Sequence, residues 1–137
     1  MAGNKPTFIL DSFAILAYFH AEAGGERVLE LLKDAQEGHA ELAMSLINVG
    51  EIVYITRRNQ GRKNAEAILK DLYALPITFH EASEERILAA AWIKSGHAVS
   101  YADSFAVQLA QELRGTLVTG DREFESIKDL KILWLMK

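Results

Sequence analysis

The sequence predicts an α/β fold, in which helices cover both faces of a mainly parallel, five-stranded sheet to form a three-layer α/β/α sandwich. The first observation is that short apolar runs alternate along the chain with longer segments of helical periodicity. The second is that the runs at 7–10 and 116–119 are nearly continuous in apolar character, as in strands buried on both faces. The third is the length of 137 residues, which suits one domain, 1–137, with a single core.

The first half of the chain starts with "TFIL", the first expected strand. The elements expected there, in order, are a strand at 7–10, helices at 12–20 and 25–37, a strand at 40–44, and helices at about 45–59 and 62–74. Gly38 is expected to stop the second helix, because glycine commonly ends helices. Gly61 separates the last two helices of this half.

The second half resumes after Pro76 with "ITFHE", the third expected strand. The elements expected there are a strand at 77–81, helices at about 84–95 and 101–114, and strands at 116–119 and 131–135. Gly96 and Gly115 follow the two helices directly. Because helices connect the strands, right-handed crossovers and parallel pairing are expected.

Composition excludes several classes of protein. The chain has no cysteine, so neither a disulfide framework nor a thiolate metal site is possible. It has no apolar run long enough to span a bilayer and no apolar signal segment at its start, so we expect a cytoplasmic protein. It also lacks a glycine-rich phosphate loop and a serine nucleophile elbow. The net charge of −4 argues mildly against a sequence-blind nucleic-acid binder.

Acidic residues follow the expected strands at the edge where ligands bind in parallel sheets. Asp11 comes directly after the strand 7–10, and Asp121 follows the strand 116–119. Glu51 lies in the helix that opens after the second strand, and Asp103 lies in the first turn of the helix 101–114. Because the carboxyl ends of parallel strands share one edge, Asp11, Glu51 and Asp121 are expected to converge there, and the loop "SGHAVS" could bring Asp103 to the same rim.

Each carboxylate also has a purely structural interpretation. Asp11 and Asp121 suit a helix cap or a turn, and Ser100 with Asp103 has the spacing of a capping box. Glu51 is harder to explain in this way, because apolar residues flank it on its helix and leave it no solvated polar stripe. A buried ion pair, a raised pKa or a metal would satisfy it, and Asn48, one turn earlier, can hydrogen-bond to it.

Clustered carboxylates repel one another, and protons or a cation must offset that repulsion. An all-oxygen set of ligands without cysteine or an obvious histidine selects a hard divalent ion, Mg²⁺ or Mn²⁺. Such an ion lowers the pKa of a bound water and neutralises charge that develops on a phosphodiester. The chemistry that this pattern favours is phosphoryl hydrolysis.

Four segments of the chain resemble, in order and spacing, the acidic motifs of PIN-domain ribonucleases, and most closely those of VapC-type toxins of toxin–antitoxin pairs. They are "FILDSFAILAYF", "SLINVGEIVY", "VSYADSFAVQLA" and "LVTGDREF". The resemblance implies a Mg²⁺- or Mn²⁺-dependent endoribonuclease with a catalytic and metal-binding quartet, namely Asp11, Glu51, Asp103 and Asp121. It further implies accessory polar roles for Ser12, Asn48 and Thr119, whereas Glu123 is one methylene longer than the acid that family members often carry there.

The resemblance also implies partners for the chain. Toxins of this type cleave RNA, generally form homodimers and are inhibited by a small antitoxin whose C-terminal segment binds near the acidic site. The expected helical pair at 45–74 is a candidate clamp for that segment, although its apolar faces equally suit ordinary core packing. A PIN nuclease of RNA maturation and a non-catalytic α/β interaction module remain as alternatives, and the second explains Glu51 poorly.

Basic residues gather in one short stretch despite the acidic total. Arg57, Arg58, Arg62 and Lys63 are candidate RNA contacts, with Lys70 nearby, because a local patch can steer phosphates. A solvated turn between two helices is the competing interpretation. The two tryptophans, Trp92 and Trp134, are expected to pack in the core.

Overall fold

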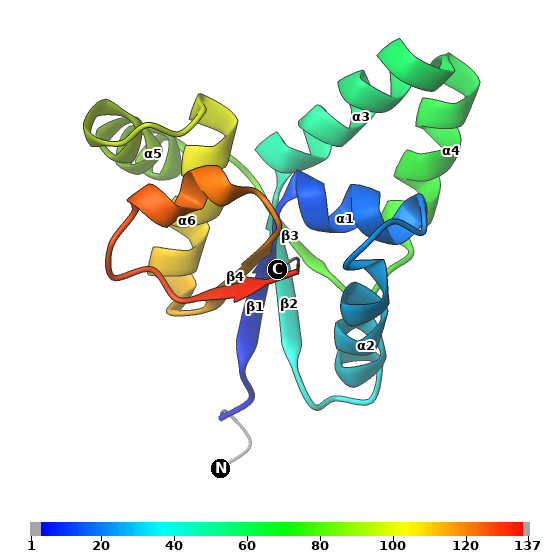
Figure 1. Ribbon diagram of the computed structural model, residues 1–137, viewed down its shortest axis with the longest axis horizontal. Coiled ribbons are helices and arrows are strands. Elements are labelled where there is room, and N and C mark those ends of the chain that lie inside the picture. The colour runs from blue at the N-terminus through cyan, green and yellow to red at the C-terminus, as the bar shows by residue number, and fades with distance from the viewer. Residues whose placement is uncertain (1–3, 136–137) are drawn as a thin grey trace.

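The computed structural model describes residues 4–135, which form one sheet with helices on both faces (Figure 1). The strands are β1 (Thr7–Leu10), β2 (Glu41–Ser45), β3 (Thr78–His80), β4 (Thr116–Thr119) and β5 (Ile132–Trp134). They pair in the order β3-β2-β1-β4-β5, and every pair is parallel. The predicted three-layer fold is confirmed, with a sheet that is wholly rather than mainly parallel.

The helices follow the predicted order closely. They are α1 (Ser12–Phe19), α2 (Gly25–Gln36), α3 (Leu46–Gln60), α4 (Arg62–Tyr73), α5 (Glu84–Gly96) and α6 (Tyr101–Leu113). A short 3₁₀ helix, η1 (Arg122–Ser126), occupies a stretch that the sequence analysis leaves without structure. Within the part of the chain that is described, no helix combines the length and apolarity needed to cross a membrane.

Serine caps and one glycine set the ends of several helices. Ser45, Ser83 and Ser100 each accept a hydrogen bond from a backbone N–H in the first turn of α3, α5 and α6, respectively. Gly61 has a φ of 91°, which side-chain-bearing residues rarely adopt, and it breaks the chain between α3 and α4 as predicted.

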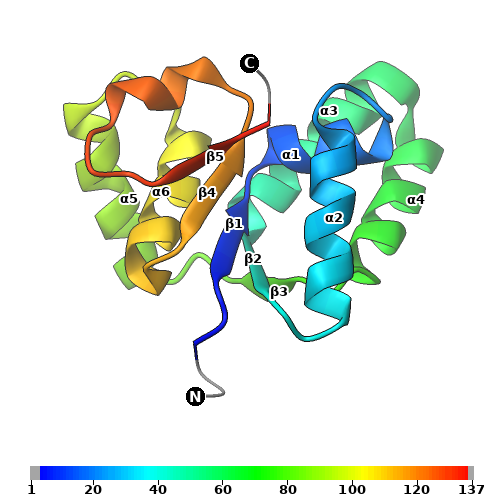
Figure 2. The ribbon, with the colours of Figure 1, turned by 60° about the horizontal axis from the view of Figure 1, so that its bottom comes forward.

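Two apolar clusters fill the space between the sheet and its two helical layers. Successive strand residues point to opposite faces, so Leu10 of β1 packs with α1 to α4, whereas Ile9 packs with α5, α6 and η1. Leu117 and Val118 of β4 divide between the clusters in the same way. Figure 2 shows these layers, with α1 to α4 on one side and α5, α6 and η1 on the other.

The strand order places a switch point between β1 and β4. From β1 the chain adds β2 and then β3 on one side, and it later adds β4 and β5 on the other side. In open parallel sheets, ligands bind beyond the carboxyl ends of the strands where the order reverses. The fold therefore points to the edge that follows Leu10 and Thr119.

The prediction that both tryptophans pack in the core is wrong for Trp92, whose side chain is 78% exposed. Ala90 and Ile93 form the buried side of α5, and Trp92 is turned away from them by the helical repeat. Trp134 is partly buried and packs against the cluster beneath α6, with the Arg122 guanidinium 4.7 Å from its ring centre.

Candidate metal centre

Asp11, the residue that follows β1, is 2% exposed and has both carboxylate oxygens bound within the fold. Its Oδ1 accepts the backbone N–H of Ala14 at 2.9 Å, so Asp11 caps α1. Its Oδ2 accepts a hydrogen bond from the hydroxyl of Thr119, at the end of β4. Capping thus takes one oxygen of Asp11 and leaves the other for the neighbouring strand.

Thr119 connects the two strands of the switch point. While its hydroxyl donates to Asp11, its oxygen accepts the backbone N–H of Asp121 at 3.0 Å. Thr119 is fully buried, and its single hydroxyl proton is committed to Asp11. This hydroxyl therefore fixes the carboxylate after β1 relative to the chain after β4.

Glu51 lies in α3 and is held by one side chain from α1 and by one from its own helix. Its Oε1 accepts hydrogen bonds from Ser12 Oγ at 2.9 Å and from Asn48 Nδ2 at 3.1 Å. Asn48 also donates to the carbonyl of Ala102 at 3.1 Å, which links α3 to the first turn of α6. Both donors act on one oxygen of Glu51, and neither bonds its Oε2.

The environment of Glu51 differs from the one predicted. Glu51 is partly buried, at the margin between the packed side of α3 and its solvent side, where Tyr54 and Arg58 are exposed. The apolar residues around it in sequence therefore do not enclose it. The polar partners Ser12 and Asn48 instead account for its fixed position.

Three further carboxylates come within reach of a single ion. One carboxylate oxygen from each of Asp103, Asp121 and Glu123 lies within 4.8 Å of the others. Asp103 is buried, Asp121 is partly buried and Glu123 is exposed. Glu123 reaches this group because Asp121 caps η1, and Oδ1 of Asp121 accepts the backbone N–H of Glu123 at 2.9 Å.

The backbone cap at the start of α6 leaves the Asp103 carboxylate at the acidic edge, where the Ser100 hydroxyl also lowers the pKa of that carboxyl. Ser100 accepts the backbone N–H of Asp103 at 3.0 Å, a bond that needs no Asp103 side chain. Capping and a role in a metal site are therefore compatible for Asp11, Asp103 and Asp121. All three belong to capped helix starts, and all three present carboxylates to the same edge.

Burial and mutual repulsion raise the pKa values of two of these groups. Burial raises the pKa of Asp11 from 3.8 to about 7, against hydrogen bonds from Thr119 and Ala14, and the Asp103 and Asp121 charges add to the increase. Burial also raises the pKa of Asp103 to about 6, with further increases from Asp121 and Glu51. The edge therefore holds more negative charge than it can keep ionised without a counter-charge.

Within residues 4–135, no basic side chain forms an ion pair with Asp11, Glu51, Asp103, Asp121 or Glu123. The counter-charge must then be protons or an ion from solution. Closely spaced carboxylate oxygens without sulfur or imidazole donors match the preference of Mg²⁺ and Mn²⁺. The residues present therefore fit a hard divalent cation.

The stability of the metal-free protein is expected to fall as pH rises from 5 to 7.5. A carboxyl whose pKa is raised in the folded state stabilises the fold below its unfolded pKa of 3.8, and that stability is lost as pH passes about 6 for Asp103 and about 7 for Asp11. For Asp11 alone this loss amounts to roughly 2 kcal/mol over the window.

Comparing wild type with Asp11→Asn isolates the contribution of Asp11, because the histidines that also titrate in this pH range are the same in both proteins. We expect urea unfolding in a chelator to show a stability difference between wild type and variant that changes by roughly 2 kcal/mol between pH 5 and 7.5. A difference that stays constant across the window would show that Asp11 is not perturbed. Glu112, whose pKa its Arg86 partner lowers to about 2, affects stability only below this window.

The candidate RNA contacts are not part of the acidic edge. Arg57 and Arg58 lie in the last turns of α3, whereas Arg62 and Lys63 begin α4, and all four are exposed. Arg62 forms an ion pair with Glu66 at 3.1 Å. Because α3 starts at the edge and extends away from it, these residues lie at the far end of the helical pair (Figure 1).

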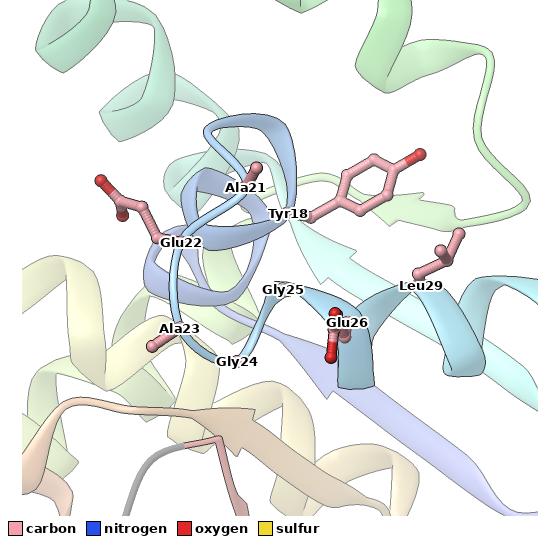
Figure 3. A pocket seen from close by; sticks show the side chains of 8 residues that line it. All are labelled: Tyr18, Ala21, Glu22, Ala23, Gly24, Gly25, Glu26 and Leu29. Carbon is pink, nitrogen blue, oxygen red and sulfur yellow. The ribbon is translucent and has the colours of Figure 1, made fainter.

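One hollow on the described surface lies away from the predicted site residues. It has a volume of about 420 Å³, lies at the turn between α1 and α2 and includes Tyr18, Glu22 and Glu26. Figure 3 shows Tyr18 and Glu22 pointing to opposite sides of this turn. None of the predicted site residues lines it. The acidic edge is therefore the better candidate for chemistry.

Comparison with known proteins identifies the family and agrees with the fold. The sequence matches the PIN domain family model over residues 8–130, whereas no curated protein sequence matches the chain. A chain of the DNA-bound VapBC structure from Salmonella typhimurium is similar in fold, with a TM-score of 0.73, 17% identity, and coverage of 95% of this chain and 98% of that one. For VapBC-1 of nontypeable Haemophilus influenzae the TM-score is 0.69, the identity is 23%, and the match covers 96% of this chain and 99% of that one.

A third similar structure is that of VapC20 from Mycobacterium tuberculosis, described as a toxin that cleaves the sarcin-ricin loop. Its TM-score is 0.67, its identity to this chain is 14%, and the coverage is 86% of this chain and 92% of that one. At these identities the structures show a shared fold. The family match extends over most of the sequence and includes all four acidic motifs, and the chain therefore belongs to the PIN-domain family.

Proposed function

We propose that this protein is a metal-dependent endoribonuclease, the toxin of a type II toxin–antitoxin pair, that hydrolyses RNA phosphodiester bonds. The observation that carries the proposal is the convergence of Asp11, Glu51, Asp103, Asp121 and Glu123 at the switch point without a basic partner among the described residues. Their oxygens suit a divalent cation, and PIN-family membership supports nuclease chemistry.

Asp103, Asp121 and Glu123 would hold a Mg²⁺ or Mn²⁺ ion, with Asp11 and Glu51 acting directly or through water. When bound, such an ion polarises a phosphoryl oxygen and lowers the pKa of a coordinated water. Including Glu123 extends the predicted quartet, because its oxygen lies within 4.8 Å of those of Asp103 and Asp121.

The accessory residues keep the carboxylates in place, and one of them favours the charged form of Asp11. Ser12 and Asn48 hold Oε1 of Glu51, which fixes its rotamer and leaves Oε2 available to the site. The Thr119 hydroxyl lowers the pKa of Asp11 by bonding its carboxylate, which opposes the effect of burial. These contacts provide the fixed geometry that a hydrolytic site needs.

An antitoxin is the proposed protein partner, because two structurally similar chains come from structures described as a toxin–antitoxin complex and as a member of the VapBC family of toxin–antitoxin systems. The proposed dock is the pair α3–α4, where Val53, Ala65 and Leu69 help to line a hollow of about 360 Å³. We further propose a homodimer, which the exposed apolar side chains of Leu88 (53%) and Trp92 (78%) on α5 support. An RNA substrate implies action in the cytoplasm.

The test of function is cleavage of a panel of structured and unstructured RNAs by the purified chain, free of any partner. We expect cutting with Mg²⁺ or Mn²⁺, no cutting in a chelator, and no cutting of DNA of the same sequences. Cleavage that is equally fast in the chelator would contradict the proposal. A nuclease of RNA maturation would share this chemistry, and co-purification with an antitoxin encoded beside it would favour the toxin.

A further inference from the structure

We propose that Tyr54 and Arg58, on the exposed side of α3, bind the RNA segment next to the cleaved bond. The Tyr54 ring would stack on a base, and the Arg58 guanidinium would contact a phosphate. This inference rests on the proposed function and specifies how the site holds its substrate.

Both residues lie on the solvent side of the helix that carries Glu51. At about 100° per residue, Tyr54 and Arg58 lie within about 60° of Glu51 around α3. The packed side of the helix, formed by Asn48, Val49, Ile52 and Thr56, faces away from them. The side chains of Tyr54 and Arg58 therefore continue the face on which Glu51 reaches the acidic edge.

Tyr54 and Arg58 form a cation–π pair, which places an aromatic ring and a positive charge side by side on the exposed surface of α3. Tyr54 is 51% exposed, and the Arg58 guanidinium carbon lies 5.5 Å from the centre of its ring. An exposed aromatic ring can stack on any of the four bases, and a guanidinium binds phosphate through paired N–H groups. The pair thus combines the two chemistries that single-stranded RNA requires.

Arg58 is also available for an anion. Four arginines of the described chain form ion pairs with carboxylates, namely Arg27, Arg62, Arg86 and Arg122. Arg58 forms none within residues 4–135 and lies over Tyr54 instead. A phosphate would therefore bind it without displacing a protein carboxylate.

The position along α3 suits a strand that leaves the site. At about 1.5 Å of rise per residue, Tyr54 lies about 4.5 Å and Arg58 about 10 Å along the axis from Glu51. In Figure 1, α3 extends outward from the edge where it begins beside α1. An RNA strand that crosses this helix from the acidic edge would reach the ring first and the guanidinium next.

The test measures binding apart from cleavage. Fluorescence anisotropy of a labelled single-stranded oligoribonucleotide is recorded in a chelator at low ionic strength, for wild type, Tyr54→Ala and Arg58→Gln. We expect about 10-fold weaker binding for each variant. The slope of log affinity against log salt should fall by about 1 for Arg58→Gln. Tyr54→Phe keeps the ring and should bind like wild type.

Arg114→Gln is the matched control. Like Arg58, Arg114 is exposed and forms no ion pair with a carboxylate within residues 4–135. It lies after α6, near the start of β4, at the edge of the sheet opposite the acidic site. Arg114→Gln should weaken binding less than 2-fold. Equal losses for Arg58→Gln and Arg114→Gln would show unspecific charge attraction and overturn the inference. So would unchanged binding by Tyr54→Ala, or no measurable binding by wild type. Unfolding curves verify that each variant is folded.

The outcomes separate this inference from the function on which it rests. Metal-dependent cleavage that Tyr54→Ala and Arg58→Gln leave intact, with unchanged binding, would retain the nuclease and reject the RNA contact. RNA binding that depends on both residues, without any cleavage, would retain the RNA contact and reject the nuclease. Unchanged RNA binding with loss of antitoxin binding would assign the surface to the protein partner and overturn the inference.

Discussion

Replacing Asp103 by Asn is expected to lower the rate of metal-dependent RNA cleavage by about 10²- to 10⁴-fold, because a metal ligand contributes several kcal/mol to transition-state stabilisation. The variant should nevertheless fold, since the cap at the start of α6 uses the backbone N–H of Asp103 rather than its carboxylate. Metal-free stability should rise, because the change removes a carboxyl whose pKa burial and neighbouring charges raise to about 6. Cleavage assays and chemical unfolding measure the two effects.

Ser100→Ala is the matched control for this prediction. It removes the hydroxyl that caps α6 and should cost about 1 kcal/mol of stability. It leaves the Asp103 carboxylate in place but removes a hydroxyl that lowers the pKa of that carboxyl, so cleavage should fall far less than in Asp103→Asn. If Asp103→Asn cut as fast as wild type while Ser100→Ala lost activity, the role of Asp103 would be structural and the proposed quartet would be wrong.

The second large effect is expected at Thr119. Thr119→Val keeps the shape of a fully buried side chain but removes the hydroxyl that donates to Asp11 and accepts from the N–H of Asp121. Leaving these groups unsatisfied should cost about 1–3 kcal/mol of stability. Cleavage should fall as well, because the carboxylate after β1 is no longer fixed relative to the chain after β4.

The pH dependence distinguishes this role from simple packing. Since the Thr119 hydroxyl lowers the pKa of Asp11, its loss should raise that pKa above about 7 and should cost more stability at pH 8 than at pH 5. Thr119→Ser restores the hydroxyl and should recover most of the stability and activity. Equal losses for Ser and Val at both pH values would indicate that the methyl group, rather than the hydroxyl, is what matters.

The parts of the site that follow from strand order could be predicted from sequence. Asp11 comes directly after β1 and Asp121 two residues after the end of β4, and the alternation of strands and helices was enough to place both at one edge of the sheet. Thr119 ends the strand before Asp121, but its bond to Asp11 depends on the register of β1 and β4, which periodicity alone does not specify.

Other features depend on tertiary contacts that local patterns do not encode. The position of Glu51 is set by Ser12, which is distant in sequence, and the apolar residues around Glu51 suggested an enclosure that the fold does not provide. Glu123 joins the site through η1, a helix too short to show periodicity, although its spacing from Asp121 was visible. Trp92 is exposed because the packed face of α5 includes Ala90 and Ile93.

The central claim is that the carboxylates of this edge act together as a metal site, and calorimetric titration of the chelator-stripped protein with Mn²⁺ at pH 7.5 tests it most directly. We expect saturable binding by wild type, with release of part of a proton from Asp11, whose pKa of about 7 leaves it partly protonated at this pH. Ser100→Ala should bind similarly, and Asp103→Asn at least 10-fold more weakly. Absence of binding to wild type up to millimolar Mn²⁺, or equal binding by Asp103→Asn, would contradict the claim.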